Sequence, residues 1–306
     1  MRQSLENVRA HVEQSVKGDI PTLRLRSGVE LPLLGLGTWG FGGREARDPS
    51  NDDTRDIRAI QRALEHGITH IDTAEAYAGG YAEELIGKAL VGIPRERLVI
   101  GSKVHDAHLA YHSILGAAQA SIDRLGCEYL DLYMLHGPSA QVGLAESFSA
   151  LNELHSRGRI KSVGLSNFPL EKVREAEALS LAPLDFVQLH YNLSVREIVE
   201  TGLLEYCQKA QIAVVAWRPL EKGKFSPEQV AFLKPLTDKY GCTVSQLAIA
   251  WLLRQEGVAT IFQTRNEDHL RENLSALNIQ IEDGDYCALR DQFPGTLSRS
   301  YSRPLS

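Results

Sequence analysis

The chain is poor in residues that build disulfide frameworks and metal centres. It has four cysteines in 306 residues, with no CxxC pair and no metal-ligand spacing. The four are Cys127, Cys207, Cys242 and Cys287. We expect unpaired thiols in a reducing compartment, and a cytoplasmic location.

Long apolar runs and concentrations of positive charge are also missing. No apolar run approaches the ~20 residues of a membrane span, and residues 1–19 mix charges throughout, unlike a secretory signal peptide. The net charge is −6, with Lys and Arg spread along the sequence, so no basic stripe is available for nucleic acid. We expect neither a membrane nor a nucleic-acid partner, and a monomer or weak homo-oligomer.

The chain is instead rich in apolar residues, at 43%, and these alternate between two patterns. Short apolar runs typical of strands alternate with segments of helical spacing. The eight runs are 34–38, 68–72, 98–103, 130–136, 160–166, 186–190, 212–217 and 258–262. Eight strands, each followed by a helix, are typical of a (β/α)8 barrel. Ahead of them, alternation at 22–26, a Ser-Gly turn and a return at 30–33 predict a β-hairpin.

We therefore predict an α/β fold, a (β/α)8 TIM barrel whose bottom is closed by the N-terminal hairpin. Residues 1–20 are predicted to form a polar extension, 21–295 the single barrel domain, and 296–306 a C-terminal tail.

Polar side chains end seven consecutive predicted strands, where such barrels carry their chemistry. Taken singly, an Asp after a strand is more often a helix cap. Taken together, the strand ends indicate a site. They are Asp72, Lys103, His136, Ser166 with Asn167, Gln188 with His190, Trp217 with Arg218, and Gln263 with Thr264.

Three of these positions, together with Tyr77, resemble a proton-transfer device. A phenol has a pKa near 10 and exchanges protons poorly at neutral pH unless a nearby cation lowers that value. Tyr77 follows Asp72 by five residues, and Lys103 and His136 end the next two strands. Together they supply the phenol, the cation, its counter-ion and a neutral hydrogen-bond donor.

The segment Gly35-Leu36-Gly37-Thr38-Trp39-Gly40 fits the dinucleotide fingerprint G-x-G-x-x-G, but its context does not. That fingerprint requires a helix to begin at the last glycine. Here two further glycines follow, and helical spacing begins only near Asp53. We interpret the segment as a first barrel strand whose glycine-rich exit lets a ligand approach the backbone.

Over residues 21–295 the sequence resembles the aldo-keto reductase superfamily. The motifs are LGLGTW at 34–39, HIDTAEAY at 70–77, SK at 102–103, DLYMLHGP at 131–138, VGLSNF at 163–168, QLHYN at 188–192 and RENL at 271–274. The resemblance implies a barrel that binds NADP(H) or NAD(H) without a Rossmann fold. It further implies an enzyme that reduces small aldehydes or ketones.

Carried over by position, the resemblance implies a catalytic tetrad. Tyr77 would be the general acid for the carbonyl oxygen, and Lys103 would lower its pKa. Asp72 would hold Lys103, and His136 would orient the carbonyl through a hydrogen bond. No metal is required.

The resemblance also implies the cofactor contacts. Ser166, Asn167 and Gln188 match residues that hydrogen-bond the nicotinamide carboxamide. Trp217 stands where a Tyr usually stacks on the nicotinamide, although a core aromatic is the alternative, and Arg218 replaces a Ser beside it. The remaining implied contacts are Gly37, Thr38, Trp39, Pro219, Leu220, Phe262, Gln263, Thr264, Arg265, His269, Glu272 and Asn273.

One departure concerns the 2′-phosphate of NADPH. Gln263 and His269 occupy the two positions where the family usually has cations, while Arg265 lies in the same loop. We therefore expect mixed use of NADPH and NADH. The physiological substrate is not implied, because His105 and the short tail with Tyr301 also differ from common patterns.

Two other functions compete with a reductase. One is a binding subunit that senses the nicotinamide redox state with little or no turnover. The other is a metal-dependent barrel hydrolase using Asp72, His136 and His190, which Lys103 disfavours because its charge would repel the ion.

Overall fold

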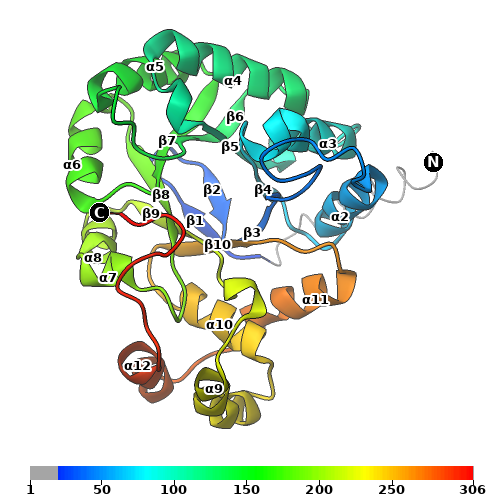
Figure 1. Cartoon of the computed structure of the whole chain (residues 1–306), viewed down its shortest axis with the longest axis vertical. Helices are drawn as coiled ribbons and strands as arrows, with labels where there is room; N and C mark the ends of the chain where they lie inside the picture. Colours follow the sequence, from blue (N-terminus) through cyan, green and yellow to red (C-terminus); the bar gives the residue numbers. More distant parts are fainter. Residues whose placement is uncertain (1–19, 306) are drawn as a thin grey trace.

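The computed structural model describes residues 20–305 and shows the predicted barrel (Figure 1). Eight parallel strands close on themselves in the order β10-β3-β4-β5-β6-β7-β8-β9. An antiparallel hairpin pairs Thr22 with Pro32 ahead of them. The predicted fold class is confirmed, whereas the predicted extension at 1–20 falls almost wholly outside the described residues.

Strand bounds agree with the predicted runs to within two residues. The hairpin strands are β1 (Thr22–Arg24) and β2 (Glu30–Pro32). The barrel strands are β3 (Leu34–Gly37), β4 (His70–Asp72), β5 (Val99–Val104), β6 (Leu130–Leu135), β7 (Ile160–Ser166), β8 (Leu184–His190), β9 (Ala213–Trp217) and β10 (Val258–Phe262).

Helices surround the barrel and connect its strands. They are α2 (Asp53–Glu65), α3 (Tyr81–Ala89), α4 (Tyr111–Leu125), α5 (Leu144–Ser156), α6 (Leu170–Leu179), α7 (Glu197–Glu200), α8 (Leu203–Lys209), α9 (Pro227–Tyr240), α10 (Val244–Leu253), α11 (Glu267–Ser275) and α12 (Asp283–Gln292). Within residues 20–305, none of these helices has the length and apolarity needed to cross a membrane.

The fold has two apolar cores, because successive side chains of a strand point to opposite faces. The outward side chains join the helices in a large buried cluster. The inward ones, including Leu132 and Met134 of β6, fill the barrel. Leu25 and Leu31 of the hairpin belong to this inner cluster, so the hairpin closes one end of the barrel.

A close contact inside the barrel explains one of the sequence's glycines. A Cβ at Gly35 of β3 would overlap the imidazole of His70 in β4. His70 is buried, and neither ring nitrogen has a hydrogen-bond partner among the described residues. Burial lowers the pKa of His70 to about 4, so the imidazole is uncharged at neutral pH and packs as part of the core. Gly35 is thus needed for packing and not to open a helix onto a dinucleotide.

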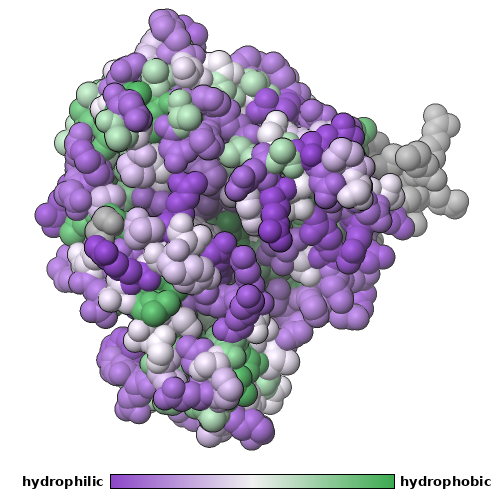
Figure 2. Space-filling model, in the orientation of Figure 1, coloured by the Kyte–Doolittle hydropathy of each residue, from purple (hydrophilic) through white to green (hydrophobic). Residues whose placement is uncertain are grey.

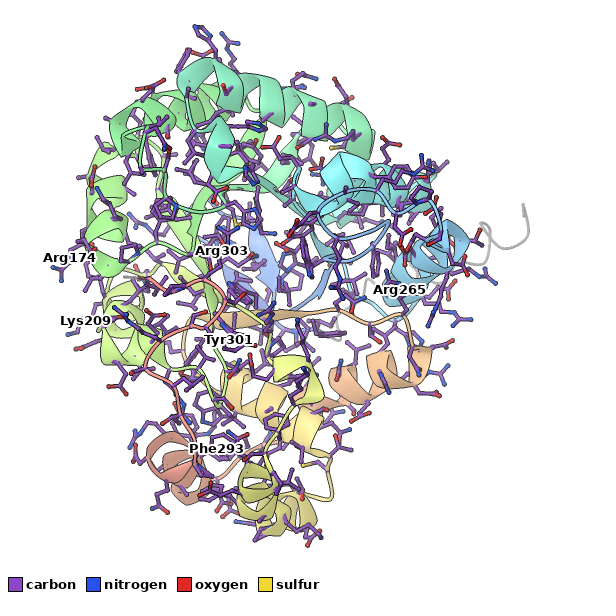
Figure 3. All side chains as sticks on the ribbon, viewed as in Figure 1. Arg174, Lys209, Arg265, Phe293, Tyr301 and Arg303 are labelled. Carbon is purple, nitrogen blue, oxygen red and sulfur yellow. The ribbon has the colours of Figure 1, made fainter. Side chains whose placement is uncertain are left out.

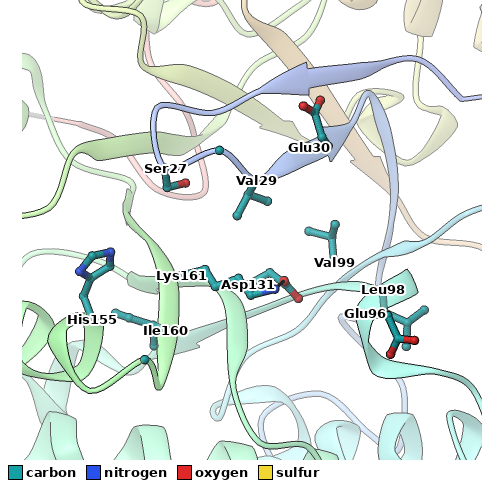
Figure 4. Close-up of a pocket in the computed structure, with 12 residues that line it drawn as sticks. Ser27, Val29, Glu30, Glu96, Leu98, Val99, Asp131, His155, Ile160 and Lys161 are labelled. Atoms are coloured by element: carbon teal, nitrogen blue, oxygen red, sulfur yellow. Dashed lines mark hydrogen bonds and ion pairs between the residues drawn. The ribbon is translucent and has the colours of Figure 1, made fainter.

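The hairpin end of the barrel also holds a cavity of about 570 Å³ (Figure 4). It lies between the hairpin and the beginnings of β5, β6 and β7, and Asp131 and Lys161 contribute to its wall. None of the side chains predicted to form the site lines it.

Candidate active site

Strand alternation places the candidate residues inside the barrel at the end opposite the hairpin. Leu132 and Met134 point inward from β6, so His136, two residues further on, continues the same face. Asp72 ends β4, and Lys103 is the penultimate residue of β5. The sequence motifs therefore converge because inward positions of neighbouring parallel strands share one mouth.

Lys103 is the centre of the candidate site. Its side chain is fully buried, and Nζ lies 2.7 Å from Asp72 Oδ1 and 2.7 Å from the carbonyl oxygen of Thr73. Its third contact is the Tyr77 hydroxyl, at 3.2 Å. Burial opposes the charge of Lys103, but Asp72 and Tyr77 outweigh it and raise the pKa above its usual value. The ammonium is therefore charged at neutral pH, with its three donors directed at three oxygens.

Tyr77 precedes α3 in a short turn and is 9% exposed. Burial raises the pKa of its phenol above 10.0, and the opposing effect of Lys103 does not offset this. The sequence prediction is correct for the direction of the lysine's effect but wrong for the net pKa, because the cost of burial is not visible in a motif. At neutral pH the phenol carries its proton and is a donor.

His136 and Trp39 flank the phenol. The ring centroids of Tyr77 and His136 lie 5.8 Å apart, and those of Tyr77 and Trp39 lie 5.0 Å apart, both edge to face. Burial and the charges of Lys103 and Arg303 hold the pKa of His136 well below its usual value. A neutral imidazole next to a phenol provides a second uncharged donor.

Three of the predicted carboxamide-binding side chains contact other site residues. Gln188 Nε2 donates to Asp72 Oδ2 at 2.7 Å. Asn167, at a positive φ of 62°, donates to the His136 carbonyl at 3.0 Å and to Ser166 Oγ at 2.9 Å. These hydrogen bonds connect the amide side chains of Gln188 and Asn167 to Asp72 and to the backbone of His136.

Trp217 is the last residue of β9, and its side chain contacts both Asn167 and His190. Its indole Nε1 donates to Asn167 Oδ1 at 3.1 Å. The His190 ring stacks on it with centroids 4.2 Å apart and planes 14° apart. Trp217 is therefore held at the barrel mouth, with one face already covered by His190.

The loop after β9 gathers positive charge. Arg218, Glu221 and Lys222 all have positive φ, so the backbone turns sharply there. The pKa of Lys222 is lowered mainly by Arg218, with smaller effects of Lys224 and of Arg44 from the loop after β3. Arg218, Lys224 and Arg44 therefore lie near enough to Lys222 to disfavour its positive charge.

The loop after β10 uses its arginine differently from the sequence expectation. Arg265 pairs through Nε with the buried Asp56 of α2, and its Nη2 donates to the Gly40 carbonyl at 2.6 Å. Asp56 also accepts from the Gly42 backbone N–H at 2.8 Å. The guanidinium therefore ties this loop to α2 and to the exit of β3.

The other predicted residues of this region surround the beginning of α11. Asn266 caps the helix, accepting from the backbone N–H of Asp268. Gln263 and His269 are exposed, Asn273 is buried, and Glu272 accepts from Thr243 Oγ1 at 2.6 Å. The neighbouring predicted contacts at the strand ends are Gly37, Thr38, Phe262, Thr264, Pro219 and Leu220.

Sequence reasoning missed a buried network formed by the C-terminal tail. Glu221 accepts from Tyr301 at 2.7 Å and lies 2.6 Å from His190 Nε2, while His190 Nδ1 lies 2.8 Å from Ser300 Oγ. Arg303 reaches Asp106, beside the candidate tetrad. Only the polar character of His190 at a strand end signalled this network, because no local pattern links residue 300 to residue 190.

The same network bears on the metal-hydrolase alternative. Both His190 nitrogens are engaged by Glu221 and Ser300, and Asp72 is paired with Lys103. Over residues 20–305, no three His, Cys, Asp or Glu side chains are grouped so that they could hold a metal ion.

Comparison with known proteins places this chain in a family. Residues 33–291 match the model of the aldo/keto reductase family, and the chain belongs to this family. It is 32% identical to an NADH-specific methylglyoxal reductase of Escherichia coli, over 86% of this chain and 95% of that protein. It is 31% identical to a glyoxal reductase of Bacillus subtilis, over 86% and 90%.

Solved structures agree. A thermostable aldo-keto reductase in complex with the inhibitor epalrestat has a TM-score of 0.85 and 39% identity, over 88% of this chain and 98% of that one. An aldo/keto reductase from Klebsiella pneumoniae in complex with NADP and acetate has a TM-score of 0.81 and 31% identity, over 93% and 99%. The chain is thus an oxidoreductase of the family, and a nicotinamide cofactor is supported.

Proposed function

We propose that the protein reduces an aldehyde or ketone to an alcohol with NADH or NADPH, Tyr77 being the general acid. The contact between the buried Lys103 ammonium and the Tyr77 hydroxyl carries this proposal. The reductases of methylglyoxal and glyoxal among the relatives support small carbonyl substrates.

The residues present suit a dinucleotide. Arg218, Lys224 and Arg44 lie close enough to Lys222 to lower its pKa, and a pyrophosphate is the kind of anion that such positively charged side chains attract. When bound, the nicotinamide supplies the hydride.

The side chains of this protein then handle the developing charge and the proton. Negative charge grows on the substrate oxygen, and the protonated Tyr77 and neutral His136 are preorganised donors for it. Tyr77 gives up its proton to that oxygen. The Lys103 ammonium, 3.2 Å away, stabilises the phenolate that remains, and Asp72 keeps the ammonium in place. Water or a buffer acid restores the phenol proton.

Consumption of reduced nucleotide tests this function directly. Absorbance of NADH or NADPH should fall stoichiometrically with methylglyoxal, glyoxal and aromatic aldehydes, and alcohol should accumulate. A sensing subunit would instead bind nucleotide with little or no turnover. Nucleotide binding without aldehyde-dependent oxidation across the panel would overturn the proposed reductase.

We further propose mixed cofactor use. Gln263 and His269 are exposed, and neither is a lysine or an arginine. The Arg265 guanidinium is already paired with Asp56 and donates to the Gly40 carbonyl. The 2′-phosphate of NADPH therefore lacks a ready bidentate partner.

Comparison of kcat/KM for the two cofactors tests this. We expect the kcat/KM values of the wild type for NADPH and for NADH to differ by less than ~10³-fold, about 4 kcal/mol. His269→Arg should raise the NADPH-to-NADH ratio, whereas Arg265→Ala should lower both activities in parallel. A selective loss of NADPH use in Arg265→Ala would show that the arginine leaves Asp56 to bind the phosphate.

We also propose a cytoplasmic location and a monomer or weak homo-oligomer. The proposed barrel domain spans residues 21–295.

A further inference from the structure

The C-terminal tail crosses the barrel mouth and is held on both sides of Arg303 (Figures 1 and 3). Glu197, a buried residue of α7, accepts from the backbone N–H of Ser300 at 2.9 Å and of Leu305 at 3.0 Å. Ser300 Oγ also accepts from the Arg303 N–H at 3.0 Å. The backbone that carries Arg303 is therefore fixed.

Arg303 extends from the tail over the ends of β5 and β6. Its Nη1 lies 3.2 Å from Asp106 Oδ2, in the loop after β5. It also lies 2.9 Å from the point where a Cβ on Gly137 would stand, next to His136. Its positive charge lowers the pKa of both Tyr77 and His136, so it is within electrostatic reach of the two donors.

This position is on the substrate side of the mouth. The residues suited to the dinucleotide come from β3, β7, β8, β9 and β10 and the segments after them, whereas Asp106 and Gly137 follow β5 and β6. Figure 2 shows this face hollowed near its centre, with hydrophilic residues around the hollow. A group bound to Arg303 would therefore be part of the molecule whose carbonyl meets Tyr77 and His136.

We propose that Arg303 binds a carboxylate on the substrate, so that the preferred substrates are aldehydes or ketones carrying such a group. This inference rests on the proposed reductase function. A guanidinium matches a carboxylate with two parallel N–H donors. Of the guanidinium nitrogens of Arg303, only Nη1 has a hydrogen-bond partner within residues 20–305, so Nε and Nη2 are available to a ligand.

A purely structural role is the competing explanation, and the exposure of the ion pair argues against it. The side chains of Arg303 and Asp106 are 38% and 31% exposed. Pairs as exposed as this stabilise a fold little, because water screens them. The tail is already anchored by Glu197, so it does not need Arg303 to stay in place.

A matched substrate pair tests the proposal. 4-Carboxybenzaldehyde is an anion at pH 7, and methyl 4-formylbenzoate is its neutral counterpart with a similarly activated carbonyl. We expect wild-type kcat/KM to be higher for the anion. Arg303→Gln should lower the anion-to-ester ratio about tenfold or more, about 1.4 kcal/mol, mainly through KM, while Arg303→Lys retains part of the preference.

Asp106→Asn should change the anion-to-ester ratio of kcat/KM in the opposite direction. Asp106 competes with a substrate carboxylate for Arg303, so removing its charge should raise the anion-to-ester ratio. Arg174→Gln is the control, because this arginine of α6 lies over the Tyr206 ring and points away from the mouth (Figure 3). It should leave the ratio unchanged.

The outcomes separate the two proposals. If the wild type reduces neither compound nor any other aldehyde, the reductase function fails. If it reduces both and Arg303→Gln leaves their ratio unchanged, only the role of Arg303 is overturned. An equal fall of the ratio in Arg174→Gln would also overturn it, because the preference would then reflect overall charge.

Discussion

The two ends of the barrel each bury a carboxylate beside a cation, yet we propose catalysis at only one of them. At the mouth, Asp72 pairs with Lys103 at 2.7 Å. At the hairpin end, Asp131 pairs with Arg95 at 2.6 Å and with Lys161 at 3.1 Å.

The difference lies in what the cations contact next. Arg95 and Lys161 both lie over the Tyr129 ring, 4.1 and 4.0 Å from its centroid, and Asp131 also accepts from the Ile100 N–H. At the mouth, the fully buried Lys103 donates to the Tyr77 hydroxyl at 3.2 Å, whereas Lys161 at the hairpin end is 46% exposed. A buried ion pair is therefore weak evidence of a site, whereas one joined to a proton donor is stronger evidence.

Removing the Tyr77 hydroxyl should have the largest effect. Tyr77→Phe keeps the ring packed against Trp39 and His136 but deletes the proton donor. We expect kcat to fall by at least ~10³-fold, within the range of general acid catalysis, while nucleotide affinity changes little. Steady-state kinetics and titration of nucleotide fluorescence measure the two. A variant that kept most of its kcat would show that another group protonates the substrate.

Lys103→Met should affect both activity and stability. The cation that stabilises the phenolate is lost, so kcat should fall by roughly 10²-fold or more. The Asp72 carboxylate would remain buried and would keep, among residues 20–305, the hydrogen bond from Gln188, so the loss of its cation costs about 3–5 kcal/mol of folding free energy. Lys103→Met with Asp72→Asn should recover much of that stability but not the activity. Recovery of activity in the double variant would contradict the role of Lys103.

The sequence predicted the barrel well because each strand repeats the same local pattern. Apolar runs placed Asp72, Lys103 and His136 at the ends of three predicted strands, and the parallel topology brings those strand ends together. Contacts that depend on long sequence separation were not predictable. Arg265 pairs with Asp56, and Tyr301 with Glu221, across loops whose paths no local pattern fixes.

Electrostatic properties were the other limit. The net pKa of Tyr77 depends on how deeply the phenol is buried, which the motif around residue 77 does not contain. The motif identifies the neighbouring cation, but the magnitude of desolvation follows only from the packed structure.

His70 predicts a pH dependence of stability that is separate from catalysis. Its pKa is about 4 in the fold and near 6.5 unfolded, so the unfolded chain binds the proton more readily. The stabilisation from this pKa difference is fully present above the pKa of the unfolded chain and is lost as pH falls. The free energy of unfolding should therefore decrease by about 2 kcal/mol between pH 7 and pH 5. The depressed pKa of His136 acts in the same direction.

Urea unfolding at the two pH values measures this loss. His70→Leu should reduce it, whereas His112→Gln, at an exposed position of α4, should not. An equal loss of stability in wild type and His70→Leu would show that the ring is not held neutral in the fold.

The smallest effect is expected at the hairpin end, and it tests the comparison itself. Lys161 is 46% exposed, and Asp131 keeps Arg95 and the Ile100 N–H when it is removed. Lys161→Met should therefore cost about 1 kcal/mol or less and leave kcat within about twofold of wild type, because no reacting group is near. Thermal unfolding and steady-state kinetics on one preparation measure both.

Lys161 also lines the cavity of about 570 Å³, so a fall in kcat beyond tenfold with unchanged stability would mean that this cavity is coupled to the mouth. The charges at the hairpin end would then be functional, and the contrast between the two ends would not hold.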